Sequence, residues 1–126
     1  MVVLDTNILI EYSKGNKEII KKLDTIHSRN LLITVFTVDE FLYGLYLRNS
    51  PDEIFLGKEL LKKLNVLDYS FNCADKTAEL RLKLRKKGQM IDDYDLCIAS
   101  VCIVNKESLL TLNKKHFQRI KELDLA

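Results

Sequence analysis

The chain begins Val2-Val3-Leu4-Asp5-Thr6-Asn7, a short apolar run that ends in an acid and two small polar residues. β-Branched valines favour a buried strand, whereas Asp, Thr and Asn are typical of a helix start. The stretch therefore predicts a strand over residues 1–4, followed at once by a helical turn over residues 6–13. Asp5 stands at the junction, where a strand of a parallel sheet would bring its carboxylate to the sheet edge.

The same change from an apolar run to a helix start recurs along the chain. Further strands are predicted over 31–36, 65–69 and 108–112, with a candidate edge strand over 123–125. Helices are predicted over 17–26, 37–47, 52–64, 72–87, from 92 or 93 to about 104, and over 114–120. Strands that alternate with helices predict an α/β domain, with a mainly parallel central sheet of about four to five strands flanked by helices.

Length and composition set the outer limits. A chain of 126 residues, 47% hydrophobic and 30% charged, fits one compact domain over residues 1–126. Its net charge of +2 permits a nucleic-acid partner without requiring one. The first residues do not show the pattern of a secretory leader, and no apolar run is long enough for a membrane span, so we expect a cytoplasmic protein without a membrane partner. Its three cysteines, with no C-x-x-C pair, are expected to be reduced.

Three acids, Asp5, Glu40 and Asp95, each lie where an apolar run gives way to a helix start. Each has a structural explanation by itself. Asp5 would cap its helix, and Glu40 would complete a capping box with Thr37. Asp95 would lie in a first helical turn, where the helix dipole favours a negative charge. In a parallel sheet, however, helix starts that follow the strands share one edge, where ligands usually bind.

Carboxylates that converge in this way need a cation. At a separation of about 4 Å and an effective dielectric near 20, each pair repels by about 4 kcal/mol. The fold must then protonate an acid or capture an ion. Mg²⁺ or Mn²⁺ fits best, because both are hard ions that prefer carboxylate oxygen and retain waters. The pattern thus predicts a metal-dependent hydrolase.

Four motifs in order resemble the PIN-domain ribonucleases, most closely the VapC toxins of VapBC toxin-antitoxin pairs. They are Val2-Val3-Leu4-Asp5-Thr6-Asn7, Thr37-x-x-Glu40-Phe41-x-x-Gly44, Ile91-x-x-x-Asp95-x-x-Ile98-Ala99 and Leu110-Thr111-x-Asn113-x-x-x-Phe117. The resemblance covers nearly the whole chain. It implies a three-layer PIN-like fold and a Mg²⁺- or Mn²⁺-dependent endoribonuclease that cuts RNA, often tRNA or rRNA, and inhibits translation. It also implies a cognate antitoxin and a homodimer.

By position, the resemblance makes Asp5, Glu40 and Asp95 the metal-binding acids. Asn113 matches a fourth catalytic position that is aspartate in many relatives, and its neutral amide leaves the site one negative charge short. We hypothesise that Asp93 supplements the metal ligands; its alternative role is the N-cap of the helix. Thr6, Asn7 and Thr111 are candidates for orienting carboxylates or a metal-bound water, although Thr111 fits equally well as an ordinary strand residue.

The proposed chemistry is hydrolysis by a metal-activated water, one carboxylate accepting the proton and the 3′ oxygen leaving. The products would carry a 5′-phosphate and a 3′-hydroxyl. Lys114, Lys115 and Arg119 are favoured for holding the RNA backbone, ahead of a second basic cluster over 81–87. For both clusters the alternative is a solvated polar face. We leave His116 out of the catalytic set.

Other readings remain open. A haloacid dehalogenase-type phosphatase would need an acid where Asn7 stands, and a receiver domain would need adjacent acids after its first strand. The main alternative is a catalytically degenerate PIN-like module that binds RNA or serves as a scaffold, because Asn113 replaces an acid. The apolar segment 41–47 has more apolar surface than one buried helix face needs, so we expect part of it to meet the next helix or another chain.

Overall fold

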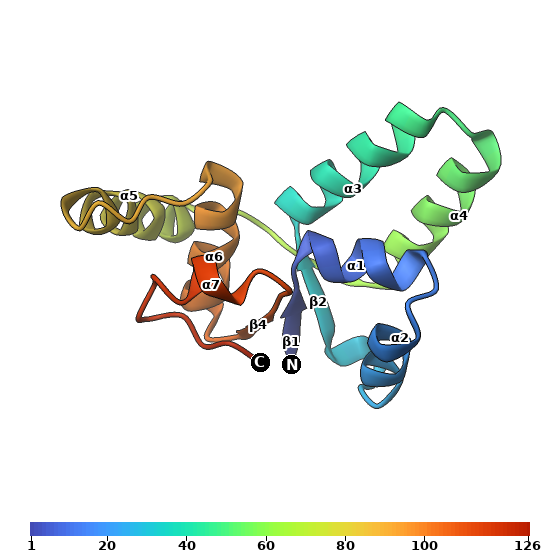
Figure 1. The fold of residues 1–126 in the computed structure, drawn as a ribbon, viewed down its shortest axis with the longest axis horizontal. Coiled ribbons are helices and arrows are strands. Elements are labelled where there is room, and N and C mark those ends of the chain that lie inside the picture. The colour runs from blue at the N-terminus through green and yellow to red at the C-terminus, as the bar shows by residue number, and fades with distance from the viewer.

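The computed structural model describes residues 1–126 as strands alternating with helices (Figure 1). The strands are β1 (Val2–Leu4), β2 (Leu31–Thr34), β3 (Asn65–Leu67) and β4 (Ser108–Leu110). The helices are α1 (Thr6–Ser13), α2 (Lys17–Asp24), α3 (Val35–Arg48), α4 (Pro51–Lys62), α5 (Phe71–Lys86), α6 (Asp93–Asn105) and α7 (Lys114–Phe117), with a 3₁₀ turn at Ser28–Asn30. None of these helices combines the length and apolarity needed to cross a bilayer.

The four strands form one parallel sheet in the order β3-β2-β1-β4. In the centre, Val3 of β1 pairs with Leu32 of β2 on one side and with Leu109 of β4 on the other. The candidate fifth strand over 123–125 is reduced to a single parallel bridge between Leu109 and Leu125. The prediction of an α/β domain with a parallel central sheet is therefore confirmed.

Side-chain alternation along the strands divides the core into two layers. Val3, Leu32 and Leu109 point to one face, where they pack with residues of α5, α6 and α7. Their neighbours Leu4, Ile33 and Leu110 point to the other face and pack with α1 to α4. Because successive strand residues face opposite sides, these short strands are buried on both faces. Figure 1 shows the result, with α5 to α7 on one side of the sheet and α1 to α4 on the other.

The start of α3 differs from the prediction. The strand expected over 31–36 ends at Thr34, and the helix begins at Val35. Thr34, not Thr37, is the N-cap, because its side-chain oxygen accepts a hydrogen bond of 3.3 Å from the Thr37 N–H. The predicted Thr37–Glu40 capping box is therefore wrong. The side chains of Thr37 and Glu40 are therefore not used in capping and can make other contacts.

Helices α3 and α4 form a hairpin that packs closely at one point. A Cβ at Gly57 of α4 would overlap the side chain of Leu45 on α3, so glycine permits the close approach. Elsewhere on α3, Tyr43, Tyr46 and Leu47 are exposed to solvent. The following helix thus covers only part of the apolar segment 41–47.

Candidate active site

Three elements bring acids to the carboxyl edge of the sheet. Asp5 follows β1 and caps α1, its Oδ1 accepting a hydrogen bond of 2.8 Å from the Thr6 N–H. Glu40 lies on α3, which begins directly after β2, the neighbour of β1. Asp95 lies in the first turn of α6. The structure therefore gathers the three acids that the sequence singled out.

Threonine hydroxyls fix two of these carboxylates. Thr111, directly after β4, donates a hydrogen bond of 2.7 Å to Asp5 Oδ2 and accepts one of 2.9 Å from the Asn113 N–H. Thr6 donates to Glu40 Oε1 over 2.7 Å, and its hydroxyl lies 3.1 Å from that of Thr37. Both oxygens of Asp5 and one oxygen of Glu40 are thus held by fixed donors, which limits their rotation.

The acids share one electrostatic environment. Burial raises the pKa of Asp5 above its ordinary value, and its hydrogen bonds oppose this. Burial also raises the pKa of Glu40, with further contributions from the charges of Asp5 and Asp92. The pKa of Asp95 rises to about 7, through burial first and then through the charges of Asp5, Asp92 and Glu40. Burial therefore disfavours the ionised form of all three acids, and the charge of Asp5 adds to this at Glu40 and Asp95.

No positive side chain relieves this repulsion. The ion pairs of the protein leave out Asp5, Glu40 and Asp95. An uncompensated carboxylate cluster with hard oxygen donors fits Mg²⁺ or Mn²⁺. As placed, no group of three or more acidic, cysteine or histidine side chains could hold a metal ion by itself. Such an ion would therefore keep several waters, as Mg²⁺ commonly does in proteins.

The Thr111 hydroxyl gives a direct test of this support. We expect Thr111→Val, which keeps the shape of the side chain, to lower metal affinity about tenfold, because Asp5 loses the donor that orients Oδ2. The partly buried hydrogen bond from the Asn113 N–H is lost as well, so the free energy of unfolding should fall by about 1–2 kcal/mol. Isothermal titration calorimetry with Mn²⁺ and urea unfolding measure the two effects.

Thr25→Val is the matched control, because the Thr25 hydroxyl is exposed and bonds only its own helix, to the Lys22 carbonyl. It should leave metal affinity unchanged. If Thr111→Val bound Mn²⁺ as tightly as the wild-type protein, Thr111 would be an ordinary strand residue.

The remaining predicted residues divide into two groups. Asn7 is close to the site, where its side chain contributes to the pKa of Asp5 and accepts a hydrogen bond of 3.2 Å from the Leu112 N–H. The Asn113 side chain turns to His116 instead, with Nδ2 and Nδ1 2.8 Å apart. Its backbone, through Thr111, is what connects Asn113 to Asp5.

Asp93 points away from the other acids. Its side chain is 76% exposed and pairs with Arg81 over 3.4 Å. The acid whose charge raises the pKa of Glu40 and Asp95 is the preceding residue, Asp92. Asp92 is also the N-cap of α6, so the expectation that Asp93 fills that role is wrong. Two adjacent acids at a helix start gave no sequence signal to choose between them.

The predicted RNA-binding residues follow β4 directly. Lys114 and Lys115 are exposed and form no ion pair, so both are free to contact a phosphate. Arg119 donates a hydrogen bond of 2.8 Å to the Met90 carbonyl and so also fixes the loop before α6. In the second basic cluster, Lys83 pairs with Glu79 and Glu122, which supports the structural role that was its alternative.

Comparison with known sequences yields consistent relatives. The profile of a family described as "PIN domain" matches residues 2–123. Ribonuclease VapC1 of Methanocaldococcus jannaschii is 30% identical over 124 residues, covering 98% of this chain and 84% of the relative. The tRNA(fMet)-specific endonuclease VapC of Salmonella typhimurium is 29% identical over 119 residues, covering 94% and 90%.

Solved structures agree with the sequences. The crystal structure of VapBC2 from Rickettsia felis, bound to a DNA fragment from its promoter, matches with a TM-score of 0.89 at 30% identity and covers 100% of this chain and 98% of that one. The DNA-bound VapBC of Salmonella typhimurium matches with a TM-score of 0.88 at 27% identity, covering 99% and 96%.

Proposed function

This chain belongs to the PIN-domain family, and from that premise we propose that it is a Mg²⁺- or Mn²⁺-dependent endoribonuclease, the toxin of a VapBC-type pair that inhibits translation. The observation that supports the proposal most is the group of Asp5, Glu40 and Asp95, whose pKa values are all raised by burial, those of Glu40 and Asp95 also by neighbouring carboxylates, with no positive side chain paired to any of them. RNA is the substrate, either tRNA or rRNA, and the relative named as a tRNA(fMet)-specific endonuclease supports tRNA.

The residues of this chain have distinct parts in the reaction. Asp5, held by Thr111 and by the Thr6 N–H, is the most rigid carboxylate and would anchor the metal with Asp95 and Glu40. A bound Mg²⁺ or Mn²⁺ would lower the pKa of water and offset phosphate charge. The pKa of Asp95 is raised and no hydrogen bond lowers it, so its ionised form would depend most on the bound cation. One of the three carboxylates would accept the proton of the attacking water. The Asn113 amide, which contacts His116, would have to turn from it to reach the substrate.

Metal-dependent cutting of RNA tests the proposal. We expect the purified protein to cleave structured RNA in Mg²⁺ or Mn²⁺ and to lose all measurable cleavage in EDTA. The fragments should carry 5′-phosphate and 3′-hydroxyl ends, because water and not the 2′-hydroxyl is the nucleophile. End-labelling and ligation assays identify these ends.

Two outcomes would contradict it. A 2′,3′-cyclic phosphate product would show that the 2′-hydroxyl attacks, which requires no metal-activated water. Tight RNA binding without cutting in either metal would select the alternative function, a degenerate PIN-like binding or scaffold module. The neutral Asn113 in place of an acid is the observation that keeps this alternative.

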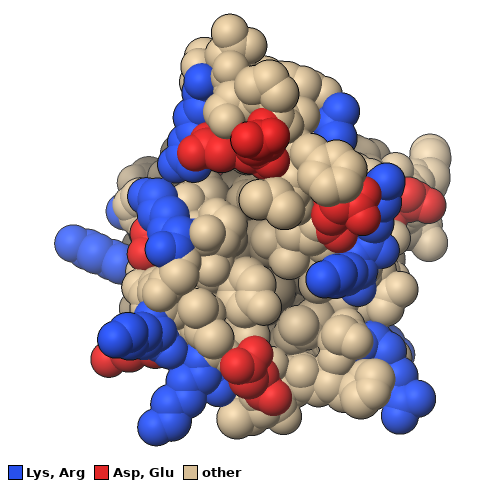
Figure 2. All heavy atoms as spheres, turned by 90° about the vertical axis from the view of Figure 1, so that its right-hand side faces the viewer, with Lys and Arg blue, Asp and Glu red and all other residues tan.

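The cognate antitoxin is expected on the face formed by α1, α2 and α4. An apolar hollow there is lined by Leu9, Tyr12, Leu23, Leu60 and Leu64. Figure 2 shows this side of the molecule, where uncharged surface fills the centre and charged side chains lie around it. A hollow lined mainly by apolar side chains can receive an apolar side chain of a partner protein. The VapBC complexes among the structural relatives support an antitoxin as its partner.

A second copy of the chain is the other expected partner. Tyr43, Tyr46 and Leu47 on α3 and Phe55 and Leu56 on α4 are large apolar side chains exposed to solvent. Residues 1–126 would act as one PIN-like unit, paired through this surface into a homodimer in the cytoplasm. The net charge of +2 leaves the apolar contact, rather than charge, to drive pairing.

A further inference from the structure

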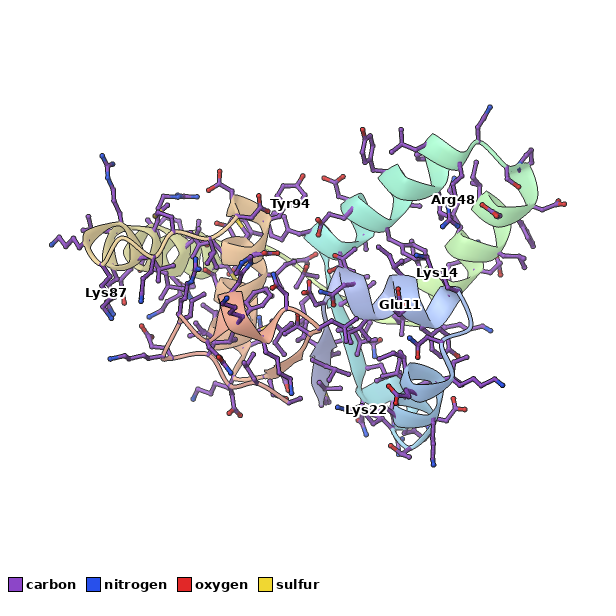
Figure 3. The ribbon with its side chains drawn as sticks, viewed as in Figure 1. Glu11, Lys14, Lys22, Arg48, Lys87 and Tyr94 are labelled. Carbon is purple, nitrogen blue, oxygen red and sulfur yellow. The ribbon has the colours of Figure 1, made fainter.

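An aromatic cluster borders the acids. The ring of Phe36, at the start of α3, contacts Tyr69 edge to face, with centroids 5.0 Å apart at 85°. It also contacts Tyr94, with centroids 5.3 Å apart at 64°. Tyr94 lies directly before Asp95 on α6, and its hydroxyl donates a hydrogen bond to the Asp39 carboxylate. Figure 3 shows Tyr94 extending from the upper end of α6 toward the start of α3.

Sheet order places this cluster on one side of the acids and the free lysines on the other. From β3 to β4, the carboxyl edge presents Tyr69 after β3, Phe36 after β2, Asp5 after β1, and Lys114 after β4. The edge is therefore aromatic at one end, acidic in the middle and basic at the other end. A polyanion with apolar rings has matching chemistry along its length.

The Tyr94 ring is held at both ends but is not enclosed. Phe36 supports the ring, and Asp39 on the exposed surface of α3 holds its hydroxyl. The residue is only half-buried, so part of the ring surface remains open. An aromatic ring fixed beforehand loses little conformational entropy when a second ring stacks on it. Arg81 lies near Tyr69 but pairs with Asp93, so stacking rather than free positive charge would hold the substrate at this end.

We propose that Tyr94, supported by Phe36 and Tyr69, forms a stacking site for an unpaired nucleobase of the RNA next to the phosphate that is cut. This inference rests on the proposed ribonuclease function and specifies where its substrate binds. Every base offers a π-face, so the site selects for unpaired nucleotides rather than for one base. It favours loops and single strands over duplex, because a base within a duplex is already stacked on its neighbours.

The experiment uses oligoribonucleotides that carry 2-aminopurine at successive positions, a base whose fluorescence falls on stacking. Asp5→Asn protein in Mg²⁺ keeps the RNA uncut during the measurement. In the Asp5→Asn protein, the second substitution Tyr94→Leu fills the space without a π-face. It should abolish the fluorescence loss at the one RNA position that stacks on Tyr94 and weaken single-strand binding about tenfold. Adding Tyr94→Phe should retain most of both, because the ring remains. Duplex RNA of the same sequence should bind equally to all variants.

Three outcomes would contradict the stacking site or the ribonuclease function on which it rests. Unchanged quenching and single-strand affinity with Tyr94→Leu, while the wild-type protein cuts RNA, would overturn the stacking site and leave the ribonuclease function intact. Equal weakening toward single strands and duplex would also overturn it, because the change would then act through the fold. A wild-type protein that neither cuts nor binds RNA would overturn the ribonuclease function, and the stacking site with it.

Discussion

The Asp5→Asn protein is expected to fold normally and to cut RNA about a thousandfold more slowly than the wild-type protein in Mg²⁺. Asparagine keeps the size of the side chain and an oxygen that can cap α1 through the Thr6 N–H. It removes the charge at the best-held carboxylate of the site, which Thr111 also fixes. Single-turnover cleavage of a labelled RNA measures the rate, and circular dichroism checks the fold.

Asp52→Asn is the matched control. Asp52 lies in the first turn of α4, is exposed and forms no ion pair, so the same chemical change there should leave the cleavage rate within about twofold. Full activity in the Asp5→Asn protein would remove Asp5 from the metal site. Equal loss in both variants would point to contamination by another nuclease or to damage to the fold.

Much of the fold is written in local patterns. The run Val2-Val3-Leu4 is apolar on both faces, as a central parallel strand requires, and the structure buries all three side chains. Asp5 caps α1 as expected, and the edge position of Glu40 and Asp95 follows from the helices that start behind β2 and before β4. Here local sequence and sheet topology agree, so the sequence alone predicts that the three acids lie at one edge of the sheet.

The contacts around these acids could not be predicted in the same way. The bond from Thr6 to Glu40 spans 34 positions in the sequence, and that from Thr111 to Asp5 spans 106. Such pairs depend on strand order and on the start of α3, which Thr34 sets rather than Thr37. The aromatic contacts of Phe36 with Tyr69 and Tyr94 likewise join three separate elements. Local periodicity carries no information on them.

The carboxylates of the candidate metal site thus repel one another in the folded protein. Asp5 and Thr37 are buried and Glu40 and Asp95 are partly buried, yet only hydroxyls and backbone N–H groups compensate the carboxylates. Carboxylates that lie close together without a cation destabilise the folded state relative to the unfolded chain. Stability without metal should therefore depend on pH in a direction that differs from that of a salt-bridged acid.

In EDTA, the Asp95→Asn protein is expected to be more stable than the wild-type protein by about 1–2 kcal/mol near pH 8, and the difference should shrink toward pH 4. The pKa of Asp95 is about 7 in the folded protein against an ordinary value of 3.8. Between these values the unfolded chain has released its proton while the folded protein still holds it, so wild-type stability falls as pH rises through that window. The expected difference is small because water screens the partly exposed Asp95 carboxylate.

Excess Mn²⁺ should reverse the order at pH 8. The ion binds the folded wild-type protein and not the unfolded chain, so it should raise the free energy of unfolding by about 2–3 kcal/mol at a concentration one hundred times Kd. The Asp95→Asn protein has lost a ligand and should gain much less. Urea unfolding across pH, with and without Mn²⁺, measures the free energy of unfolding of both proteins in both conditions. If Asp95→Asn were the less stable protein in EDTA at pH 8, Asp95 would be a stabilising residue, and the case for repulsion relieved by a metal would fail.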